Sequence, residues 1–322
     1  MGDPLLALDD LAVHFKVGST LGGGVHTLKA VDGVTLDVKP GECLGLVGES
    51  GCGKSTLALA IMGLVPPTRG HINLDGRDLM QRERLETART VQMVFQDPYA
   101  SLNPRQTVRR TLADPLRIHG VSDKAEVEAR VVDMMAKVGL RPEHADRYPH
   151  EFSGGQRQRI GIARALILKP KLVICDEPVS ALDVSIRAQI INLLLELKDE
   201  LGLAYIMISH DLGVVEHVSD RVAVMYLGRI VEQGGWQEIF ENPRHPYTRA
   251  LIAAIPDPFH RAAVSARAKA KGEIPSALNP PPGCHFHPRC PLKADICVAQ
   301  APPLEAVAAG HRAACHFRDR RD

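Results

Sequence analysis

The sequence has no long uninterrupted apolar run. A membrane-spanning helix needs roughly 20 mainly apolar residues, and the longest apolar candidates in this chain are cut by Lys, Asp or Gly. The opening residues, MGDPLLALDD, also lack the positive charge and the small-residue cleavage site of a secretory signal. We therefore expect neither a membrane span nor export, so any work at a membrane would be done from one side of it.

A large net charge is also missing. The 39 Lys and Arg residues nearly balance the 38 Asp and Glu residues, which leaves a net charge of +1. Such a chain has no global attraction for nucleic acid or anionic lipid, so we expect no nucleic-acid partner and look for anion binding at local groups. The 322 residues, 45% of them hydrophobic and 24% charged, are typical of a globular protein with one large or two modest domains.

Short apolar runs alternate with helical patterns along much of the chain. Buried strands are predicted at residues 43–48, 91–95, 171–175, 204–209 and 221–226. Apolar residues at three- and four-residue spacing predict helices at residues 54–64, 156–168 and 185–201. This alternation predicts an α/β fold with a mainly parallel core sheet.

The secondary-structure signals of the sequence change in two regions. At about 97–170 the strand signal fades and helical patterns dominate, which predicts an inserted helical subdomain. Ten of the 23 prolines lie in residues 256–303, where periodicity is also lost. We therefore expect a main domain over 1–255 and an extension with little core of its own over 256–322, with an exposed basic linker at 261–272.

The segment GESGCGKST follows a predicted strand and precedes a predicted helix, which is the context of a phosphate-binding P-loop. Its glycines allow a close approach of the backbone, whose N–H groups can surround a phosphate at the helix N-terminus. Lys54 would supply a positive charge and Ser55 a ligand for Mg²⁺. A chance match has odds on the order of one per cent at average Gly usage, so a plain Gly-rich turn is disfavoured. The predicted ATP-binding residues of this loop are Gly48, Glu49, Ser50, Gly51, Cys52, Gly53, Lys54, Ser55 and Thr56.

The segment KLVICDEP is a predicted strand that ends in two carboxylates. Ligands of open α/β sheets bind at the carboxyl ends of the strands. Asp176 would face the metal, and Glu177 would orient or deprotonate the attacking water, because phosphoryl transfer needs a positioned nucleophile. Alone, such a pair is more often a solvated turn, but the P-loop upstream reverses that preference.

The segment FSGGQRQRIGIARAL places Ser, Gly, Gly and Gln directly before an Arg-rich amphipathic helix. This is a second helix N-terminus suited to an anion. A lone SGGQ would usually be a capped helix start. Together with the P-loop it predicts a second phosphate-contacting surface at Ser153, Gly154, Gly155 and Gln156.

These motifs, with Gln96 in VFQDP, SALD at 180–183 and His210 in ISHD, follow the order of ABC-transporter nucleotide-binding domains, and over residues 5 to about 255 the chain resembles that family. The resemblance implies an ABC-type P-loop NTPase fold with a β subdomain and a helical subdomain. It implies catalytic roles for Glu177, His210 and Gln96, and Mg²⁺ ligation by Ser55, Gln96 and Asp176.

The resemblance also implies a head-to-tail pair of subunits. Each P-loop would face the partner's SGGQ across a bound ATP, with Asp183 at the seam and His210 at the γ-phosphate. Phe15 matches the aromatic that stacks on adenine in similar proteins, although as a lone aromatic it is equally compatible with a core position. Phe152 stands where many relatives have Leu.

Four of the seven cysteines lie in the last 39 residues, with the spacing C-x5-C-x6-C-x17-C. The surrounding segment is too poor in apolar residues to fold unaided, so a bound metal would explain its order. The spacing differs from the CxxC pairs of zinc sites, which leaves Zn²⁺ possible, and four thiolates suit an iron–sulfur cluster equally well. Scattered reduced thiols are the remaining alternative. The four cysteines are Cys284, Cys290, Cys297 and Cys315.

The segments NPRHPYTRALIAAIP and GEIPSALNPPPGCHFHPRC resemble the C-terminal extension of ATPase subunits of dipeptide and oligopeptide importers, most nearly the second ATPase of dipeptide permeases. The resemblance implies a [4Fe–4S] cluster at the four cysteines, with Zn²⁺ as the alternative. His285, His287, His311 and His316 are nearby, but we interpret them as surface histidines.

As partners, the resemblance implies two membrane permease subunits, a paralogous ATPase in preference to a homodimer, and an extracytoplasmic peptide-binding protein. It implies a location on the cytoplasmic face of the bacterial inner membrane. Import of nickel or of longer oligopeptides is the alternative within the class. A non-transport ABC ATPase is disfavoured because no coiled-coil insertion or second cassette is visible, and an exporter because no membrane helices are fused to the chain.

Overall fold

The computed structural model describes residues 3–18, 25–254 and 272–320. The chain divides into two compact units, each formed from several segments. The first comprises Met1–Leu6, Val38–Cys43 and Leu74–Ile208, and the second comprises Ala7–Asp37, Leu44–Asn73 and Ser209–Asp322. Among the described residues, no helix is both long enough and apolar enough to cross a membrane.

The first unit contains a parallel sheet in the order β8, β7, β6. Its strands are β6 (Val91–Val94), β7 (Leu172–Asp176) and β8 (Ala204–Ile208). Ile174 pairs with Met93 on one side and with Ile206 on the other, and nearly all residues of the three strands are buried. Three of the predicted strands are thereby confirmed, and the apolar runs fit strands that are covered on both faces.

Helices make up the rest of the first unit, apart from the two-residue strand β5 (Arg77–Asp78). Residues 97–170 are all described and contain no strand. Short polar side chains at the helix starts accept backbone N–H bonds, as Thr107 and Asp123 do. The helices are η1 (Leu79–Gln81), α2 (Arg84–Thr90), α3 (Pro98–Ser101), α4 (Val108–Ile118), α5 (Lys124–Lys137), η2 (Pro142–His144), η3 (Pro149–Glu151), α6 (Gly154–Leu166) and α7 (Val184–Leu201).

The second unit contains a mixed sheet in the order β11, β12, β10, β9, β3. Strand β9 is parallel to β3 and antiparallel to β10, and the two tail strands continue the antiparallel pairing. The strands are β3 (Cys43–Val47), β9 (Arg221–Tyr226), β10 (Arg229–Gly235), β11 (Glu305–Ala308) and β12 (His311–Ala313).

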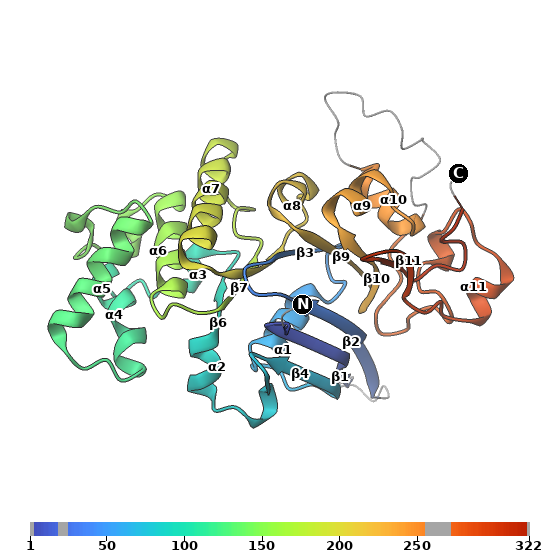
Figure 1. The fold of residues 1–322 in the computed structure, drawn as a ribbon, viewed down its shortest axis with the longest axis horizontal. Coiled ribbons are helices and arrows are strands. Elements are labelled where there is room, and N and C mark those ends of the chain that lie inside the picture. The colour runs from blue at the N-terminus through green and yellow to red at the C-terminus, as the bar shows by residue number, and fades with distance from the viewer. Residues whose placement is uncertain (1–2, 19–24, 255–271, 321–322) are drawn as a thin grey trace. The chain divides into compact units, whose positions relative to one another are not determined.

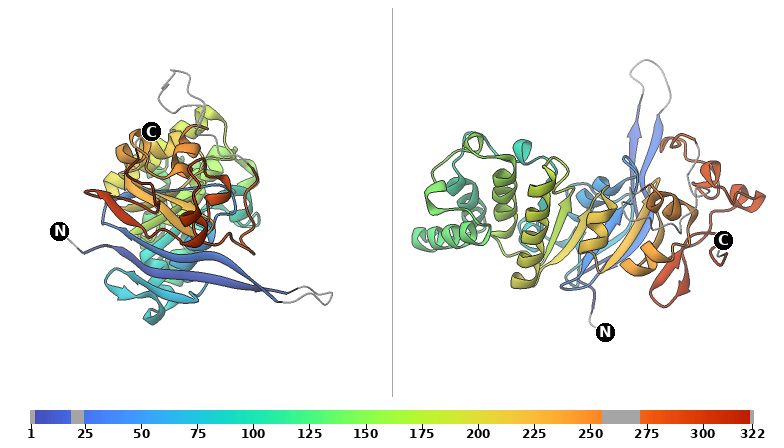
Figure 2. Two further views of the ribbon diagram at one scale, coloured as in Figure 1. Left: turned by 90° about the vertical axis from the view of Figure 1, so that its right-hand side faces the viewer. Right: turned by 90° about the horizontal axis from the view of Figure 1, so that it is seen from above.

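A separate sheet in the order β2, β1, β4 forms the β subdomain of the second unit. Its strands are β1 (Leu6–Val17), β2 (His26–Val38) and β4 (Arg69–Leu74), and the two long strands β1 and β2 run side by side in Figures 1 and 2. The helices of this unit are α1 (Lys54–Ile61), α8 (Leu212–Val218), α9 (Trp236–Glu241), α10 (Pro246–Ile252), η5 (His287–Arg289) and α11 (Asp295–Ala299).

The C-terminal segment is more than an appendage. Phe286 is 1% exposed and packs against the rings of Tyr226 and Tyr247, with centroids 5.4 Å away in both cases. Together with the pairing of β12 to β10, this packing makes the tail part of the core of the second unit. Sequence periodicity did not predict this packing of the tail, because strands of three and four residues are too short to show an alternating pattern.

The predicted domain boundary at residue 255 lies outside the described residues, as does nearly all of the predicted basic linker at 261–272. The division into a main domain and an extension therefore stays a prediction.

Candidate nucleotide site

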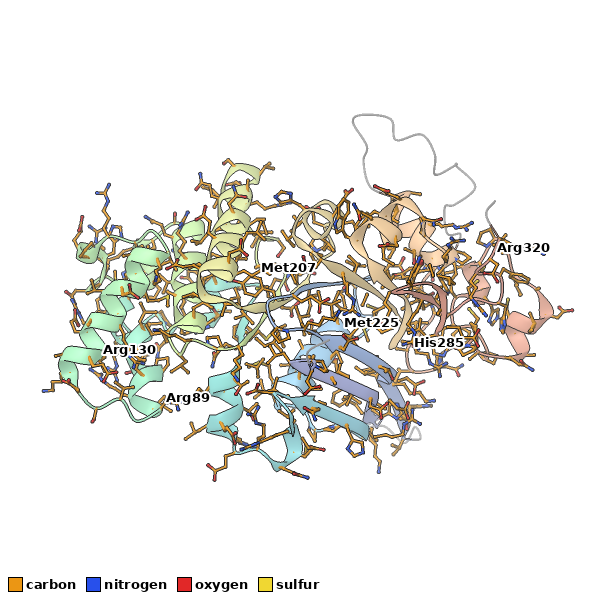
Figure 3. The ribbon with its side chains drawn as sticks, in the orientation of Figure 1. Arg89, Arg130, Met207, Met225, His285 and Arg320 are labelled. Carbon is orange, nitrogen blue, oxygen red and sulfur yellow. The ribbon has the colours of Figure 1, made fainter. Side chains whose placement is uncertain are left out.

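The P-loop connects β3 to α1, and two of its glycines are required by close backbone neighbours. A Cβ atom on Gly48 would lie 2.2 Å from the carbonyl oxygen of Met225, which is labelled in Figure 3. A Cβ atom on Gly53 would lie 2.1 Å from the carbonyl oxygen of Ala30, and Gly53 has a φ of 112°. No L-residue with a side chain could occupy either position without displacing main chain. The loop is therefore shaped by strands on either side of it.

Lys54 is buried at the start of α1. Its ammonium donates to the carbonyl oxygens of Gly48 at 2.7 Å and Glu49 at 3.1 Å. It also lies 3.7 Å from the sulfur of Cys52, and burial is the main reason why the pKa of that thiol is raised. The positive charge is thus held over the first residues of the loop, where a phosphate would need it.

Sequence reasoning missed two residues that contact this loop. The N–H of Glu49 donates to the hydroxyl of Tyr247 at 2.8 Å, so it is not directed at a phosphate as predicted for the whole 48–56 range. The carboxylate of Glu49 forms a two-point ion pair with Arg289. No local pattern could reveal these contacts, because the partners lie 198 and 240 residues further along the chain.

The SGGQ turn begins α6 in the first unit. The hydroxyl of Ser153 accepts the N–H of Gln156 at 3.4 Å, and the Gln156 side chain accepts the N–H of Ser153 at 3.1 Å. This capping box satisfies two donors that a helix start leaves unpaired. A Cβ atom on Gly155 would lie 2.5 Å from the side chain of Ile186 in α7, whereas Ser153 and Gly154 are exposed. The capped helix start and an exposed phosphate-contacting surface are both compatible with this geometry.

The end of β7 holds the predicted metal and catalytic carboxylates. The amide nitrogen of Gln96 donates to the carboxylate of Glu177 at 2.9 Å, which brings these two predicted residues together. Glu177 follows Asp176 with a φ of 47°, an unusual value for a residue with a side chain, and its N–H bonds to the carbonyl of Ile208. Such backbone strain is characteristic of functional sites.

The remaining predicted residues lie on exposed ends of elements. Asp183 precedes α7, where Val184 is 80% exposed. His210 is exposed just after β8, and it belongs to the second unit, as the P-loop does. Phe15 is 37% exposed on β1 in that same unit, so it is not a core residue. An exposed ring leaves the predicted stacking role open.

The four C-terminal cysteines lie near enough to influence one another. Burial raises the pKa of Cys290 to about 12, and the charges of the other three cysteines add to that rise. Burial likewise raises the pKa of Cys315 to about 11, with contributions from Cys284 and Cys297. In the described part of the chain, however, no three His, Cys, Asp or Glu side chains are arranged to hold a single metal ion.

Two of the four tail histidines are not the surface residues that we expected. His311 is 1% exposed and lies 2.8 Å from the carboxylate of Glu232, and His287 is also buried. Each histidine has a protein partner: the Nδ1 of His287 lies 2.9 Å from the carbonyl of Cys284, and His285 and His316 face main-chain carbonyls. His285 is labelled in Figure 3. His287 and His316 thus bond the tail's own main chain, whereas His285 and His311 bond Leu227 and Glu232, which lie before the tail. Buried polar groups require such partners.

Comparison with known proteins identifies the class. Residues 31–180 match the family described as ABC transporter. The fold is similar to cbiO1 of Clostridium perfringens, part of an ABC transporter complex, with a TM-score of 0.65 and 29% identity over 75% of this chain and 92% of that one. It is also similar to the dimeric cassette MJ0796 in a post-hydrolysis state bound to ADP and Pi. The TM-score is 0.63, with 27% identity over 72% of this chain and 98% of that one. The protein is an ABC transporter ATPase.

The particular family follows from matches that include the tail. Residues 231–297 match the oligopeptide/dipeptide transporter C-terminal region. The chain is 51% identical to the oligopeptide transport ATP-binding protein AppF of Bacillus subtilis, over 98% of each chain. It is 55% identical to the oligopeptide transport ATP-binding protein OppF of Escherichia coli, over 94% of this chain and 92% of that one. It is 50% identical to the dipeptide transport ATP-binding protein DppF of the same organism, over 98% of this chain and 95% of that one. The chain belongs to the oligopeptide and dipeptide transport ATP-binding proteins.

Proposed function

We propose that this ATPase energises the import of dipeptides or other short peptides through a membrane permease. The observation that carries the proposal is the similarity of nearly the whole chain, tail included, to ATP-binding proteins of oligopeptide and dipeptide transport. The nucleotide-binding motifs and the tail both resemble those of such importers. Longer oligopeptides and nickel are the alternative substrates, to be separated by experiment.

The first unit supplies the chemical step in this proposal. Glu177 orients and deprotonates the attacking water, and Gln96, which donates to it at 2.9 Å, holds its carboxylate. Gln96 and Asp176 of this unit offer amide and carboxylate oxygens, and Ser55 of the second unit offers a hydroxyl; these are donor types that Mg²⁺ prefers. Bound Mg²⁺ would neutralise charge on the phosphates.

The second unit supplies nucleotide binding. Lys54 provides positive charge at the β- and γ-phosphates, and the N–H groups at the start of α1 face the same anion. His210 contacts the γ-phosphate, and the exposed ring of Phe15 stacks on the adenine. Gly48, Glu49, Ser50, Gly51, Cys52, Gly53 and Thr56 complete the proposed loop.

A second ATPase completes each site, and a paralogous subunit is favoured over a second copy. The exposure of Ser153 and Gly154 supports a partner ATPase of either kind, because an internally capped turn on the surface is available to a nucleotide held by another subunit. Asp183, exposed at the start of α7, lies at the seam of the pair. Nucleotide binding then stabilises the closed pair, and hydrolysis reopens it.

An aromatic surface beside Gln96 is suited to the two permease subunits. Phe95 is 41% exposed and Tyr99 is 61% exposed, and the guanidinium of Arg157 lies 4.7 Å from the centre of the Tyr99 ring. Exposed aromatic and Arg side chains are typical of protein interfaces. Because Gln96 directly follows Phe95 in the chain and donates to Glu177, docking there can influence hydrolysis. The subunit would work at the cytoplasmic face of the bacterial inner membrane, with an extracytoplasmic peptide-binding protein in the complex.

We also propose a [4Fe–4S] cluster at Cys284, Cys290, Cys297 and Cys315. A single Zn²⁺ needs four sulfurs about 3.8 Å apart, as follows from its 2.3 Å bonds and tetrahedral geometry. A cluster binds each thiolate at a different iron, so its ligands lie further apart. The four cysteines influence one another's pKa, so they lie near enough together for a shared cluster to be tested. Brown protein with iron and sulfide after anaerobic purification is the expected result, and colourless zinc-containing protein would refute it.

Transport itself is tested in liposomes that contain the permease subunits, this chain and the sister ATPase obtained by purification in mild detergent. We expect ATP-dependent uptake of labelled dipeptide when the binding protein is added, and no uptake when this chain carries Glu177→Gln. Labelled hexapeptide and Ni²⁺ are measured in parallel. Uptake of Ni²⁺ without peptide uptake would contradict the proposal, and failure to copurify any membrane subunit would favour a non-transport ATPase.

A further inference from the structure

Glu49 is held at three points, and two of them come from the C-terminal part of the chain. Arg289 Nη1 lies 2.7 Å from one carboxylate oxygen of Glu49, and Nη2 lies 2.9 Å from the other. The N–H of Glu49 donates to Tyr247, and its carbonyl accepts from the ammonium of Lys54 at 3.1 Å. A direct chain of contacts therefore runs from the tail to the P-loop lysine.

Arg289 is a residue that the tail itself holds in place. It ends the short helix η5 and immediately precedes Cys290. Its side chain is 8% exposed and lies over the rings of Phe286 and Tyr226, 5.8 and 6.0 Å from their centres. The hydrogen bonds to Glu49 are the main reason why the pKa of Arg289 is raised. The guanidinium thus stays charged at any physiological pH.

Stability alone explains this ion pair poorly. The side chains of Arg289 and Glu49 are 8% and 25% exposed. Removing charges from water to this degree costs solvation energy that offsets much of their attraction, so the pair is weak evidence for stabilisation. The Nε of Arg289 is also buried and has no hydrogen-bond partner among the described residues. Meanwhile Glu49 is the one acidic side chain within GESGCGKST, a loop that must accept a polyanion. An uncompensated carboxylate there would repel phosphate.

We propose that Arg289 is a positioning residue of the nucleotide site: it neutralises Glu49 and holds it so that Lys54 and the P-loop are shaped to receive the triphosphate. Arg289 acts through Glu49 and does not touch the nucleotide. The C-terminal extension thereby becomes part of the machinery that sets nucleotide affinity.

The direct test uses the full chain and a non-hydrolysable ATP analogue with Mg²⁺, with affinity measured by calorimetry. Arg289→Met should weaken binding by about tenfold, which corresponds to about 1.4 kcal/mol. Arg289→Lys, which keeps the charge but loses the two-point geometry, should fall between it and the wild type. Lys54→Ala marks the loss expected from a group that contacts phosphate itself.

Arg318→Met is the matched control, because it removes a tail arginine whose ion-pair partner is Glu305, away from the P-loop. Its affinity should equal that of the wild type. An equal loss in this control, or unchanged affinity in Arg289→Met whatever its melting temperature, would overturn the proposal. If Arg289→Met does not fold, the comparison of Arg289→Lys with Arg318→Lys decides in the same way.

Relief by a second substitution separates positioning from a general structural role. In the double variant Arg289→Met with Glu49→Gln, no carboxylate is left without a partner, so most of the lost affinity should return. Tyr247→Phe, which removes the hydroxyl that accepts the Glu49 N–H, should weaken binding less than Arg289→Met. Failure of Glu49→Gln to recover any affinity would show that Arg289 does not act through Glu49.

Discussion

Two helix starts in this protein carry Gly-rich sequences suited to phosphate, and they are held by different means. The P-loop before α1 contacts residues 198 and 240 positions away, Tyr247 and Arg289. The turn before α6 closes on itself within three residues, through the reciprocal bonds of Ser153 and Gln156. The first loop thus depends on long-range contacts, whereas the cap of the second turn is local and its Ser153 and Gly154 are exposed. An exposed, internally capped turn suits a surface that a partner subunit uses.

The largest expected effect separates binding from chemistry. Glu177→Gln should lower the rate of ATP hydrolysis by about 10²–10⁴-fold, because the positioned base is lost. Nucleotide affinity should be retained, since the P-loop contacts lie in the other unit. Phosphate release by the assembled transporter and nucleotide binding to the full chain are the two measurements. Unchanged turnover would refute the assigned role.

Removing a buried aromatic ring from the tail should show how much the tail contributes to the stability of the second unit. Phe286→Ala removes a buried aromatic that packs on Tyr226 and Tyr247, so the free energy of unfolding should fall by about 3–5 kcal/mol. Urea denaturation gives this value. Phe317→Ala is the control, because Phe317 lies in the same tail but is only half-buried and should cost much less. Equal losses would mean that the tail is not packed as described.

Lowering the pH should reduce the stability of the second unit, because His245 resists protonation in the folded state. Burial lowers the pKa of His245 to about 4, against a partly opposing effect of Glu232 and a reinforcing one of Arg249. Between pH 6.5 and about 4 the unfolded chain binds a proton that the folded chain does not. The free energy of unfolding should therefore fall as the pH drops through this window, by up to about 1.4 kcal/mol per pH unit.

His245→Asn tests this origin of the pH dependence, because Asn can still accept the N–H of Tyr247 as the helix cap but does not titrate. Its unfolding free energy should change less between pH 6.5 and 4 than that of the wild type. Parallel pH profiles for the two proteins would exclude His245 as the cause.

The smallest expected effect concerns the self-closed turn. Ser153→Ala should cost about 1 kcal/mol of stability, the usual contribution of a helix cap. Thr107→Ala, at the cap of α4, should cost a similar amount. Only Ser153→Ala should also reduce nucleotide-dependent association with the sister ATPase, measured by light scattering. A similar reduction in both variants would assign the loss to stability rather than to contact with the nucleotide.

Much of the fold could be predicted because its signals are local. The strands of residues 43–47, 91–94, 172–176, 204–208 and 221–226 are short apolar runs, and the helices α1, α6 and α7 show three- and four-residue spacing. The P-loop and SGGQ motifs are contiguous, so their context before helices was readable as well. The pairing of Gln96 with Glu177 joins residues 81 apart, and the family resemblance, not spacing, placed both at one site.

What the amino-acid sequence determined by itself is the set of chemical groups and the local elements that present them, because short-range periodicity and contiguous motifs need no knowledge of the rest of the chain. Only the tertiary structure decided that Phe286 enters the core, that His311 is buried on Glu232, and that Arg289 neutralises the acidic residue of the P-loop. These contacts join segments 60 to 240 residues apart. Long-range packing selects such partners from many residues of similar chemistry, and no local pattern marks the ones that meet.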